Sequence, residues 1–129
     1  MSAPEGRTWI GEARLRFADL DGLGHVNSLS LAALAEDGRM RIILDMPMTP
    51  LSEFMLVSFS MQYLAPAGIE HDVTVTTALT RIGRSSFTLS HTLEQANTCL
   101  ARAESVVVHV DKKARKSLPL SEEQLQFLQ

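Results

Sequence analysis

The sequence is poor in cysteine and has no long apolar run, and each shortage excludes a class of protein. Cys99 is the only cysteine, so no disulfide can form within the chain, which suits a reducing compartment. No stretch approaches the roughly 18 apolar residues of a membrane-spanning helix. The first seven residues lack the apolar core of a signal peptide. We therefore expect a cytoplasmic protein with no membrane partner.

Net charge and chain length limit the kind of partner and the number of domains that we expect. The net charge is −3, which argues against nucleic acid as a partner because phosphate binding favours a basic surface. The 129 residues are 45% hydrophobic and 21% charged, as is ordinary for a globular protein. They contain no internal repeat or linker. We therefore predict one domain over residues 1–129, with residues 1–7 as a loose tail.

Alternating apolar and polar residues predict a series of strands. The first, Thr8–Ala18, alternates Leu15 and Phe17 with arginines. The others are expected over residues 55–63, 72–82, 86–94 and 99–111. The last should present one apolar face made of Leu100, Val106, Val108 and Val110. Because the connections after Tyr63 are short, we expect these strands to pair as an antiparallel meander.

A helix is predicted from about Ser28 to Leu44, capped by Asn27 or Ser28. Gly38 weakens it by ~1 kcal/mol relative to alanine. Its buried stripe is expected to comprise Leu29, Ala33, Glu36, Met40 and Ile43. A second, terminal helix should follow Pro119, where Ser121 and Gln124 have the spacing of a capping box.

The long strands and the apolar central helix must bury each other, since neither has another apolar partner. A sheet of such long strands twists and curls. The expected fold class is therefore α+β, with a long curved antiparallel sheet wrapped around one central helix.

The stretch most suggestive of chemistry is Phe17–Asn27, which joins the first strand to the helix. The unpaired N–H groups at a helix N-terminus stabilise negative charge. A carboxylate nearby, such as that of Asp21, could attack a carbonyl or activate water while those N–H groups receive the oxyanion. The same residues are also ordinary turn and cap residues, and both interpretations stay open on chemistry alone.

Several segments together resemble a known family. The sequence from Asp19 to Asn27 resembles the D-x-D-x-x-G-H-V-N signature of the hotdog-fold 4-hydroxybenzoyl-CoA thioesterase family. The segment 63–66 is similar to its Y-L-x-P strand end, and 82–87 to its G-[RK]-x-S-F turn. Asp72 and the pair 118–119 also fit. The resemblance covers most of the chain and implies the hotdog fold.

The resemblance also implies an activity, acyl-CoA thioester hydrolysis. It makes Asp21 the nucleophile or general base, and the Ser28 backbone N–H the group that polarises the thioester carbonyl. His25 and Asn27 belong to the same signature. The CoA nucleotide would be bound near the turn and the end of the last strand, by Arg84, Ser85, Ser86, Arg115 and Lys116. CoA is then part of the substrate, and no separate cofactor is expected.

The family forms dimers with active sites at the subunit interface, so a homodimer or a dimer of dimers is expected. Three departures stand out in this chain. Ser28 replaces a second asparagine, which leaves the backbone donor in place. Leu31 and Leu34 stand where many members carry aromatic residues, which leaves the acyl group open. Ser85 replaces a basic residue of some members.

Other interpretations remain beside these. Glu36 could position a catalytic water or pair with an arginine at the subunit interface. His25 could shape the loop or bind a metal with Asp19 and Asp21, although no recognised ligand spacing is present, so no metal is expected. The basic run 112–116 is either a solvated face or a phosphate contact.

His71, His91 and His109 look like ordinary strand residues. The main alternative to an enzyme is a non-catalytic hotdog protein that binds acyl-CoA or acyl-carrier-protein thioesters. A hotdog dehydratase is disfavoured because the chain lacks the His–Asp pair of that family.

Overall fold

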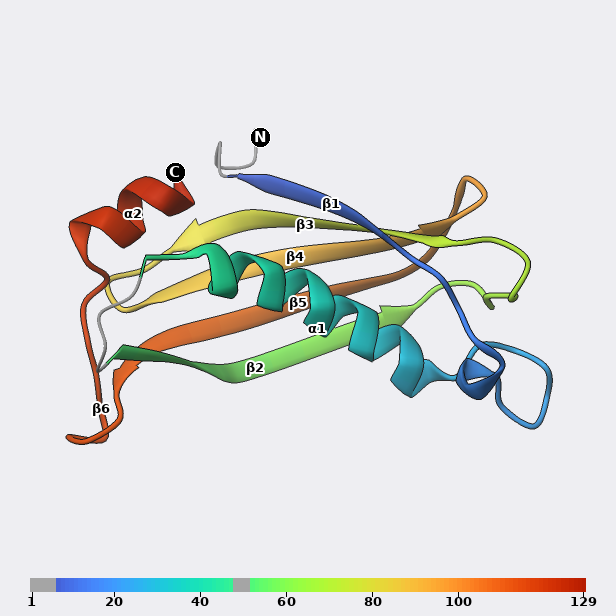
Figure 1. Ribbon diagram of the computed structural model, residues 1–129, viewed down its shortest axis with the longest axis horizontal. Coiled ribbons are helices and arrows are strands. Elements are labelled where there is room, and N and C mark those ends of the chain that lie inside the picture. Colours follow the sequence, from blue (N-terminus) through green and yellow to red (C-terminus); the bar gives the residue numbers. More distant parts are fainter. Residues whose placement is uncertain (1–6, 48–51) are drawn as a thin grey trace.

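A computed structural model describes residues 7–47 and 52–129. Along the chain, its elements are β1 (Thr8–Ala13), a 3-10 turn η1 (Phe17–Asp19), α1 (Ser28–Asp45), β2 (Ser52–Tyr63), β3 (Val73–Ile82), β4 (Ser86–Gln95), β5 (Thr98–Asp111), β6 (Lys116–Ser117) and α2 (Glu122–Leu128). The strands form one six-stranded antiparallel sheet in the order β1-β3-β4-β5-β2, with β6 paired to the end of β5. Helix α1 runs along this sheet, and α2 lies at one end (Figure 1).

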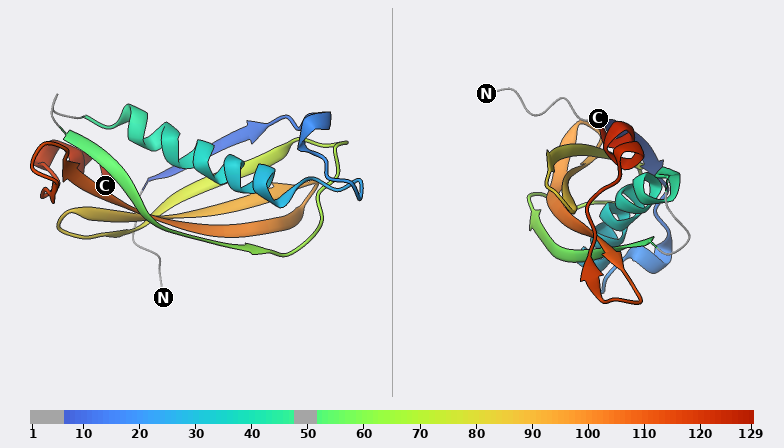
Figure 2. Two further views of the ribbon diagram at one scale, coloured as in Figure 1. Left: turned by 90° about the horizontal axis from the view of Figure 1, so that it is seen from below. Right: turned by 90° about the vertical axis from the view of Figure 1, so that its left-hand side faces the viewer.

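The sheet curls around α1, as the view along the molecule shows (Figure 2). The predicted architecture, a curved antiparallel sheet around one central helix, is therefore confirmed. The terminal helix is also confirmed, with Ser121 and Gln124 forming the expected capping box. No helix in the described part of the chain is long and apolar enough to span a membrane.

Two predictions about the strands are wrong. The first strand ends at Ala13, because Asp19 accepts a hydrogen bond from the Arg16 backbone and holds η1, which leaves the Phe17 side chain 84% exposed. The meander holds only for β3, β4 and β5, whereas β2 pairs with β5. The connection from β2 to β3 instead crosses the end of the sheet (Figure 1).

The predicted loose tail falls on residues 1–6, which lie outside the described residues, and on Arg7, which is ordered against the fold. The Arg7 carbonyl accepts a hydrogen bond from the Leu79 backbone, and its guanidinium lies 4.6 Å from the centre of the Phe127 ring.

The predicted buried face of α1 is also wrong. The residues facing the sheet are Leu31, Ala35, Gly38, Arg39 and Ile42. Leu29 is 75% exposed, and the side chain of Glu36 is 64% exposed. Both sets have helical spacing, so periodicity could not choose between them. Gly38 marks the true face, because a Cβ at this position would overlap the Thr77 hydroxyl of β3.

Strand faces follow the prediction in β4 and depart from it in β5. Phe87, Leu89, His91 and Leu93 are all buried. In β5, Val107 is fully buried, whereas Val106, Val108 and Val110 are only half-buried. The register shifts where Leu93 pairs with Ala101 and Glu94 pairs with Cys99, so the residue between them, Leu100, is extra. Such a bulge reverses which residues face the core.

A chain of buried polar groups joins α1 to the middle of the sheet. His91 lies 2.9 Å from the Thr77 hydroxyl through Nδ1 and 2.8 Å from the Ser105 hydroxyl through Nε2. The Arg39 guanidinium donates to the same Ser105 hydroxyl at 3.3 Å. Since buried polar groups are costly unless paired, these bonds fix how the helix sits on the sheet.

This cluster predicts a loss of stability in acid. Burial, together with the charge of Arg39, lowers the pKa of His91 from 6.5 to about 4. Between those values the unfolded chain binds a proton that the folded chain excludes, so stability is lost as the pH falls. We expect a loss on the order of 3 kcal/mol between pH 7 and pH 4 from this residue. Urea unfolding of wild type and His91→Gln across that range measures it, and equal pH dependence in the two proteins would contradict it.

Candidate functional site

The loop before α1 is closed on itself by backbone hydrogen bonds. The Asp21 N–H donates to the His25 carbonyl at 2.8 Å, and the Gly24 N–H donates to the Asp21 carbonyl at 3.2 Å. Gly24 has φ +83, a conformation that side chains disfavour. The loop is thus a defined turn that presents Asp21 at a fixed position.

The carboxylate of Asp21 is held through one of its two oxygens. Its Oδ1 accepts the backbone N–H groups of Leu23 at 2.8 Å and His25 at 3.2 Å. Within the described residues, Oδ2 accepts no hydrogen bond, and the side chain is exposed. One carboxylate oxygen is therefore oriented by the loop and the other faces solvent.

Helix α1 begins directly after this loop. The Asn27 side chain caps it by accepting the Leu29 N–H at 2.8 Å. In the part of the chain that the structure describes, the N–H of Ser28 has no acceptor. The Tyr63 hydroxyl donates to the Ser28 carbonyl at 3.0 Å, which ties β2 to the helix start. The positive end of the helix thus carries an open N–H donor.

Asp21 and Ser28 line the same open hollow, which has a volume of about 380 Å³. Its walls come from the helix start, the end of β2 and the segment that follows β2. The lining comprises Asp21, Val26, Ser28, Leu31, Tyr63, Leu64, Ala65, Pro66 and Ala67. A carboxylate and a helix N-terminus therefore both contribute to the wall of one recess, an arrangement that suits acyl-transfer chemistry.

Asp19 plays a different part in the same loop. Its carboxylate accepts the Arg16 backbone N–H at 2.8 Å and lies 3.6 Å from the Arg16 guanidinium. The backbone hydrogen bond is the main reason that the pKa of Asp19 lies below its ordinary value. The Asp19 carbonyl also accepts the Asn27 N–H at 2.6 Å. The contacts of Asp19 therefore stabilise the loop.

His25 contributes through its backbone, and the residues that the structure describes contain no group of three potential metal ligands. Glu36 does not line the hollow of Asp21. It lies in a neighbouring groove between α1 and β2, with Ala33, Leu56 and Phe59, and pairs with Arg39 of its own helix at 3.3 Å.

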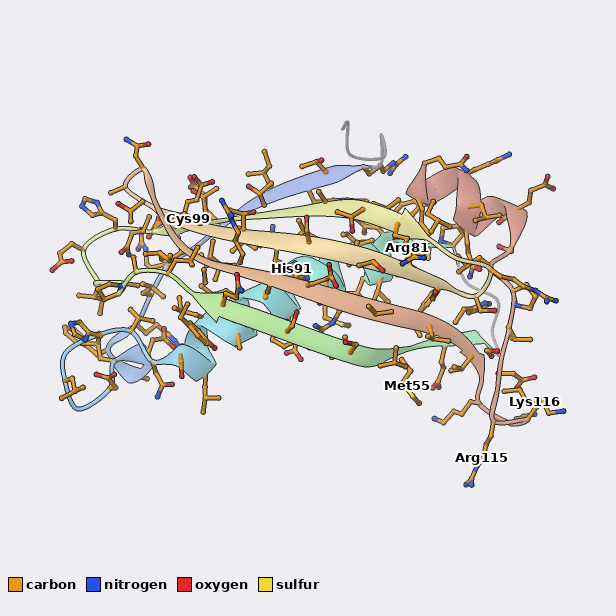
Figure 3. The ribbon with its side chains drawn as sticks, turned by 180° about the vertical axis from the view of Figure 1, so that it is seen from behind. Met55, Arg81, His91, Cys99, Arg115 and Lys116 are labelled. Atoms are coloured by element: carbon orange, nitrogen blue, oxygen red, sulfur yellow. The ribbon has the colours of Figure 1, made fainter. Side chains whose placement is uncertain are left out.

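The residues expected to contact the nucleotide gather at the opposite end of the molecule. The His109 N–H donates to the Ser85 carbonyl, and the Leu118 N–H donates to the His109 carbonyl. This places the turn with Arg84, Ser85 and Ser86 beside the segment that follows Arg115 and Lys116. Figure 3 shows Arg115 and Lys116 at the far end from the loop before α1. One copy of the chain therefore keeps the two sets of residues apart.

Sequence reasoning missed the walls of the hollow. Tyr63–Pro66 was noted only as part of the resemblance, yet Tyr63 contacts the helix start and this segment closes one side of the recess. It also missed the buried partners of His91. Nothing local in the sequence indicates either set of contacts, because both depend on pairing between distant segments.

The comparisons with known proteins agree with this geometry. The model of the thioesterase-like superfamily matches residues 15–128. No protein with a curated description matches the sequence.

Among solved structures, a 1,4-dihydroxy-2-naphthoyl-CoA thioesterase from Synechocystis shares 22% identity, covers 94% of this chain and 95% of its own, and superposes with a TM-score of 0.83. A 4-hydroxybenzoyl-CoA thioesterase with an aspartate-to-asparagine substitution, in complex with 4-hydroxybenzoyl-CoA, shares 14% identity over 95% and 99% of the two chains, with a TM-score of 0.84. A Staphylococcus aureus protein in complex with CoA shares 14% over 98% and 85%, with a TM-score of 0.87. These likenesses confirm the hotdog fold.

Proposed function

The chain belongs to the thioesterase-like superfamily, and from that premise we propose that it hydrolyses acyl-CoA thioesters to a free acid and CoA. One observation carries the proposal. Asp21, which has one carboxylate oxygen free of hydrogen bonds in the described structure, and Ser28, whose N–H has no acceptor there, line the same hollow.

The chemistry follows from this pair. A thioester carbonyl placed against the Ser28 N–H becomes more electrophilic, and its oxygen gains negative charge in the tetrahedral intermediate. The helix N-terminus stabilises that charge. Asp21 either attacks the carbonyl carbon, giving an acyl-enzyme anhydride that water then hydrolyses, or takes a proton from the attacking water. In both routes the C–S bond breaks and CoA leaves as a thiolate, which takes up the proton released from the attacking water.

A second copy of the chain completes the proposed site. Strand β2 spans 12 residues, or ~40 Å at ~3.3 Å per residue. Its Tyr63 end lines the hollow of Asp21. Its Ser52 end pairs with Asp111, next to the basic run 112–116, which forms the basic end of the molecule. Two-fold pairing of two β2 edges would be antiparallel and would set the Tyr63 end of one copy beside the Ser52 end of the other. The hollow of one protomer would then adjoin the basic end of its partner.

The free edge of β2 supports such pairing. Among the described strands, β2 pairs only with β5. Its exposed apolar side chains include Met55, Leu56, Val57 and Phe59. Met55 projects from β2 at the border of the sheet (Figure 3). A long apolar edge left open invites aggregation unless another strand covers it.

The basic end predicts a binding defect that depends on the nucleotide. Arg115→Asn with Lys116→Gln should raise KM for acyl-CoA about tenfold with little change in kcat, since two phosphate contacts of about 1 kcal/mol or less are lost. Asparagine is chosen because Arg115 has φ +55, which asparagine tolerates.

Two controls frame this measurement. An acyl-pantetheine substrate has no nucleotide, so its KM should not change in the double variant. Lys112→Gln removes a charge from the same run of residues, but the Lys112 ammonium already pairs with Glu53 at 3.2 Å. The KM of this variant for acyl-CoA should therefore equal that of the wild type. Unchanged KM for acyl-CoA in the double variant would show that the basic run is only a solvated face.

The proposed function itself is tested by thiol release from aromatic, short-chain and long-chain acyl-CoAs. We expect the wild type to turn over at least one class well above the buffer rate. Tight binding of acyl-CoA without release of thiol or acid would instead support a carrier or sensor.

A further inference from the structure

A buried glutamine holds the wall of the proposed site from behind. Gln95 ends β4 and is 9% exposed. Its Oε1 accepts the Gly68 N–H at 3.1 Å, and its Nε2 donates to the Gly68 carbonyl at 2.7 Å and to the His71 carbonyl at 2.8 Å. The amide thus uses its acceptor and both donors on the backbone of one irregular segment, the crossing between β2 and β3.

That segment is linked directly to the start of α1. The Ala67 carbonyl, next to Gly68, accepts the Val26 N–H at 3.0 Å. Both Ala67 and Val26 are buried and both line the hollow. Val26 in turn precedes Asn27, which caps the helix, and Ser28, which carries the open N–H. A continuous run of short backbone contacts therefore connects the Gln95 amide with the oxyanion donor.

We propose that Gln95 is a positioning residue for thioester hydrolysis, a role that rests on the function proposed above. It touches neither substrate nor reacting atoms. It fixes residues 67–71, which fix Val26 and so set where the Ser28 N–H lies relative to Asp21. Because the stabilisation of an oxyanion depends steeply on donor position, loosening this support should weaken transition-state stabilisation more than substrate binding.

Other parts of the fold offer weaker support for the same backbone. Leu64 and Ala65 bond to the Leu100 carbonyl, which anchors the segment nearer β2. Beyond Ala67, the side chain that hydrogen-bonds to the backbone of the segment in the described structure is Gln95, and Arg14 lies 4.0 Å from the exposed carboxylate of Asp72 at the end of the segment. The backbone around Gly68 is therefore held mainly by one amide.

The test uses Gln95→Met, which keeps the length of the side chain and removes all three hydrogen bonds. Gln95→Glu serves as a second variant, because it keeps the acceptor for Gly68 and loses both donors. Gln126→Met, on an exposed position of α2, is the matched control for the substitution itself. Each protein is assayed below its melting temperature, with kcat and KM determined separately and amide hydrogen exchange followed at Val26 and Gly68.

We expect both Gln95 variants to lower kcat about tenfold or more while KM changes less than about threefold. Exchange at Val26 should be about tenfold faster than in wild type, and the control should match wild type in every readout. If Gln95→Met fails to fold, Gln95→Glu carries the test. Normal kcat in an active protein, or a rise in KM alone, would overturn the proposal.

If wild type hydrolyses no thioester, the proposed function fails by itself. Exchange at Val26 then decides whether Gln95 holds the helix start, and unchanged exchange overturns that role.

Discussion

Asp21→Asn is expected to lower kcat at least about a hundredfold while KM stays within a few-fold. Asparagine keeps an oxygen that can accept the N–H groups of Leu23 and His25, so the loop should keep its shape. The Ser28 N–H remains available to bind the thioester carbonyl. What disappears is the negatively charged oxygen that attacks the carbonyl or accepts a proton from water. Steady-state kinetics on the best acyl-CoA of the panel measures the effect.

The neighbouring aspartate provides the matched control. Asp19→Asn removes a carboxylate from the same loop, but the Asp19 carboxylate bonds to Arg16 and its carbonyl to Asn27, which are contacts within the loop. Asp19→Asn should lower kcat much less than Asp21→Asn does, and it should mainly lower the stability of the fold. A larger loss of kcat from Asp19→Asn than from Asp21→Asn would show that the wrong carboxylate has been assigned.

A protein that cannot pair through β2 should lose nearly all activity. Met55 and Val57 are 55% and 54% exposed in one copy, so Met55→Lys with Val57→Lys should cost the isolated fold little. Lysines on an edge strand oppose pairing with a second strand. If each site needs the hollow of one protomer and the basic end of the other, the resulting monomer loses all of the partner's nucleotide contacts and not only two charges. Its kcat/KM should therefore be at least about a hundredfold lower. Sedimentation and thiol release measure the two effects on one sample.

The opposite edge of the sheet supplies the control. Ile10 lies on β1 and is also exposed, so Ile10→Lys places a lysine on an edge that the proposed dimer does not use. This variant should stay dimeric and active. A wild type that sediments as a monomer and still hydrolyses acyl-CoA would rule out the shared site.

The fold was largely predictable because its strongest signals are local. Phe87, Leu89, His91 and Leu93 alternate with polar residues without interruption, and all four are buried. In β5 the same reasoning selected the wrong valines, because the bulge at Leu100 depends on pairing with β4 and leaves no mark in the β5 sequence. The face of α1 was misassigned because the helix is apolar on several sides, and only its contact with Thr77 explains Gly38.

The candidate site could be predicted as far as it lies in one continuous segment. Asp21, Asn27 and Ser28 belong to one loop and helix start, and a cap followed by an apolar helix can be recognised from sequence. Tyr63 and Ala67 reach the same hollow because β2 pairs with β5 and the connection that follows β2 crosses the end of the sheet. Gln95 binds backbone groups 24 to 27 residues earlier, and a polar residue at a strand end carries no signal of such partners.

The most direct test of the account is to restore activity by mixing two defective proteins. Asp21→Asn and the double variant Arg115→Asn, Lys116→Gln are unfolded together, refolded and assayed at substrate far below KM. In a shared site, each mixed dimer has one hollow and one basic end intact in the same site. With random pairing the mixture should recover about a quarter of wild-type activity, well above the mean of the two separate variants. Activity equal to that mean would contradict a thioesterase site that takes Asp21 from one copy and its nucleotide contacts from the other.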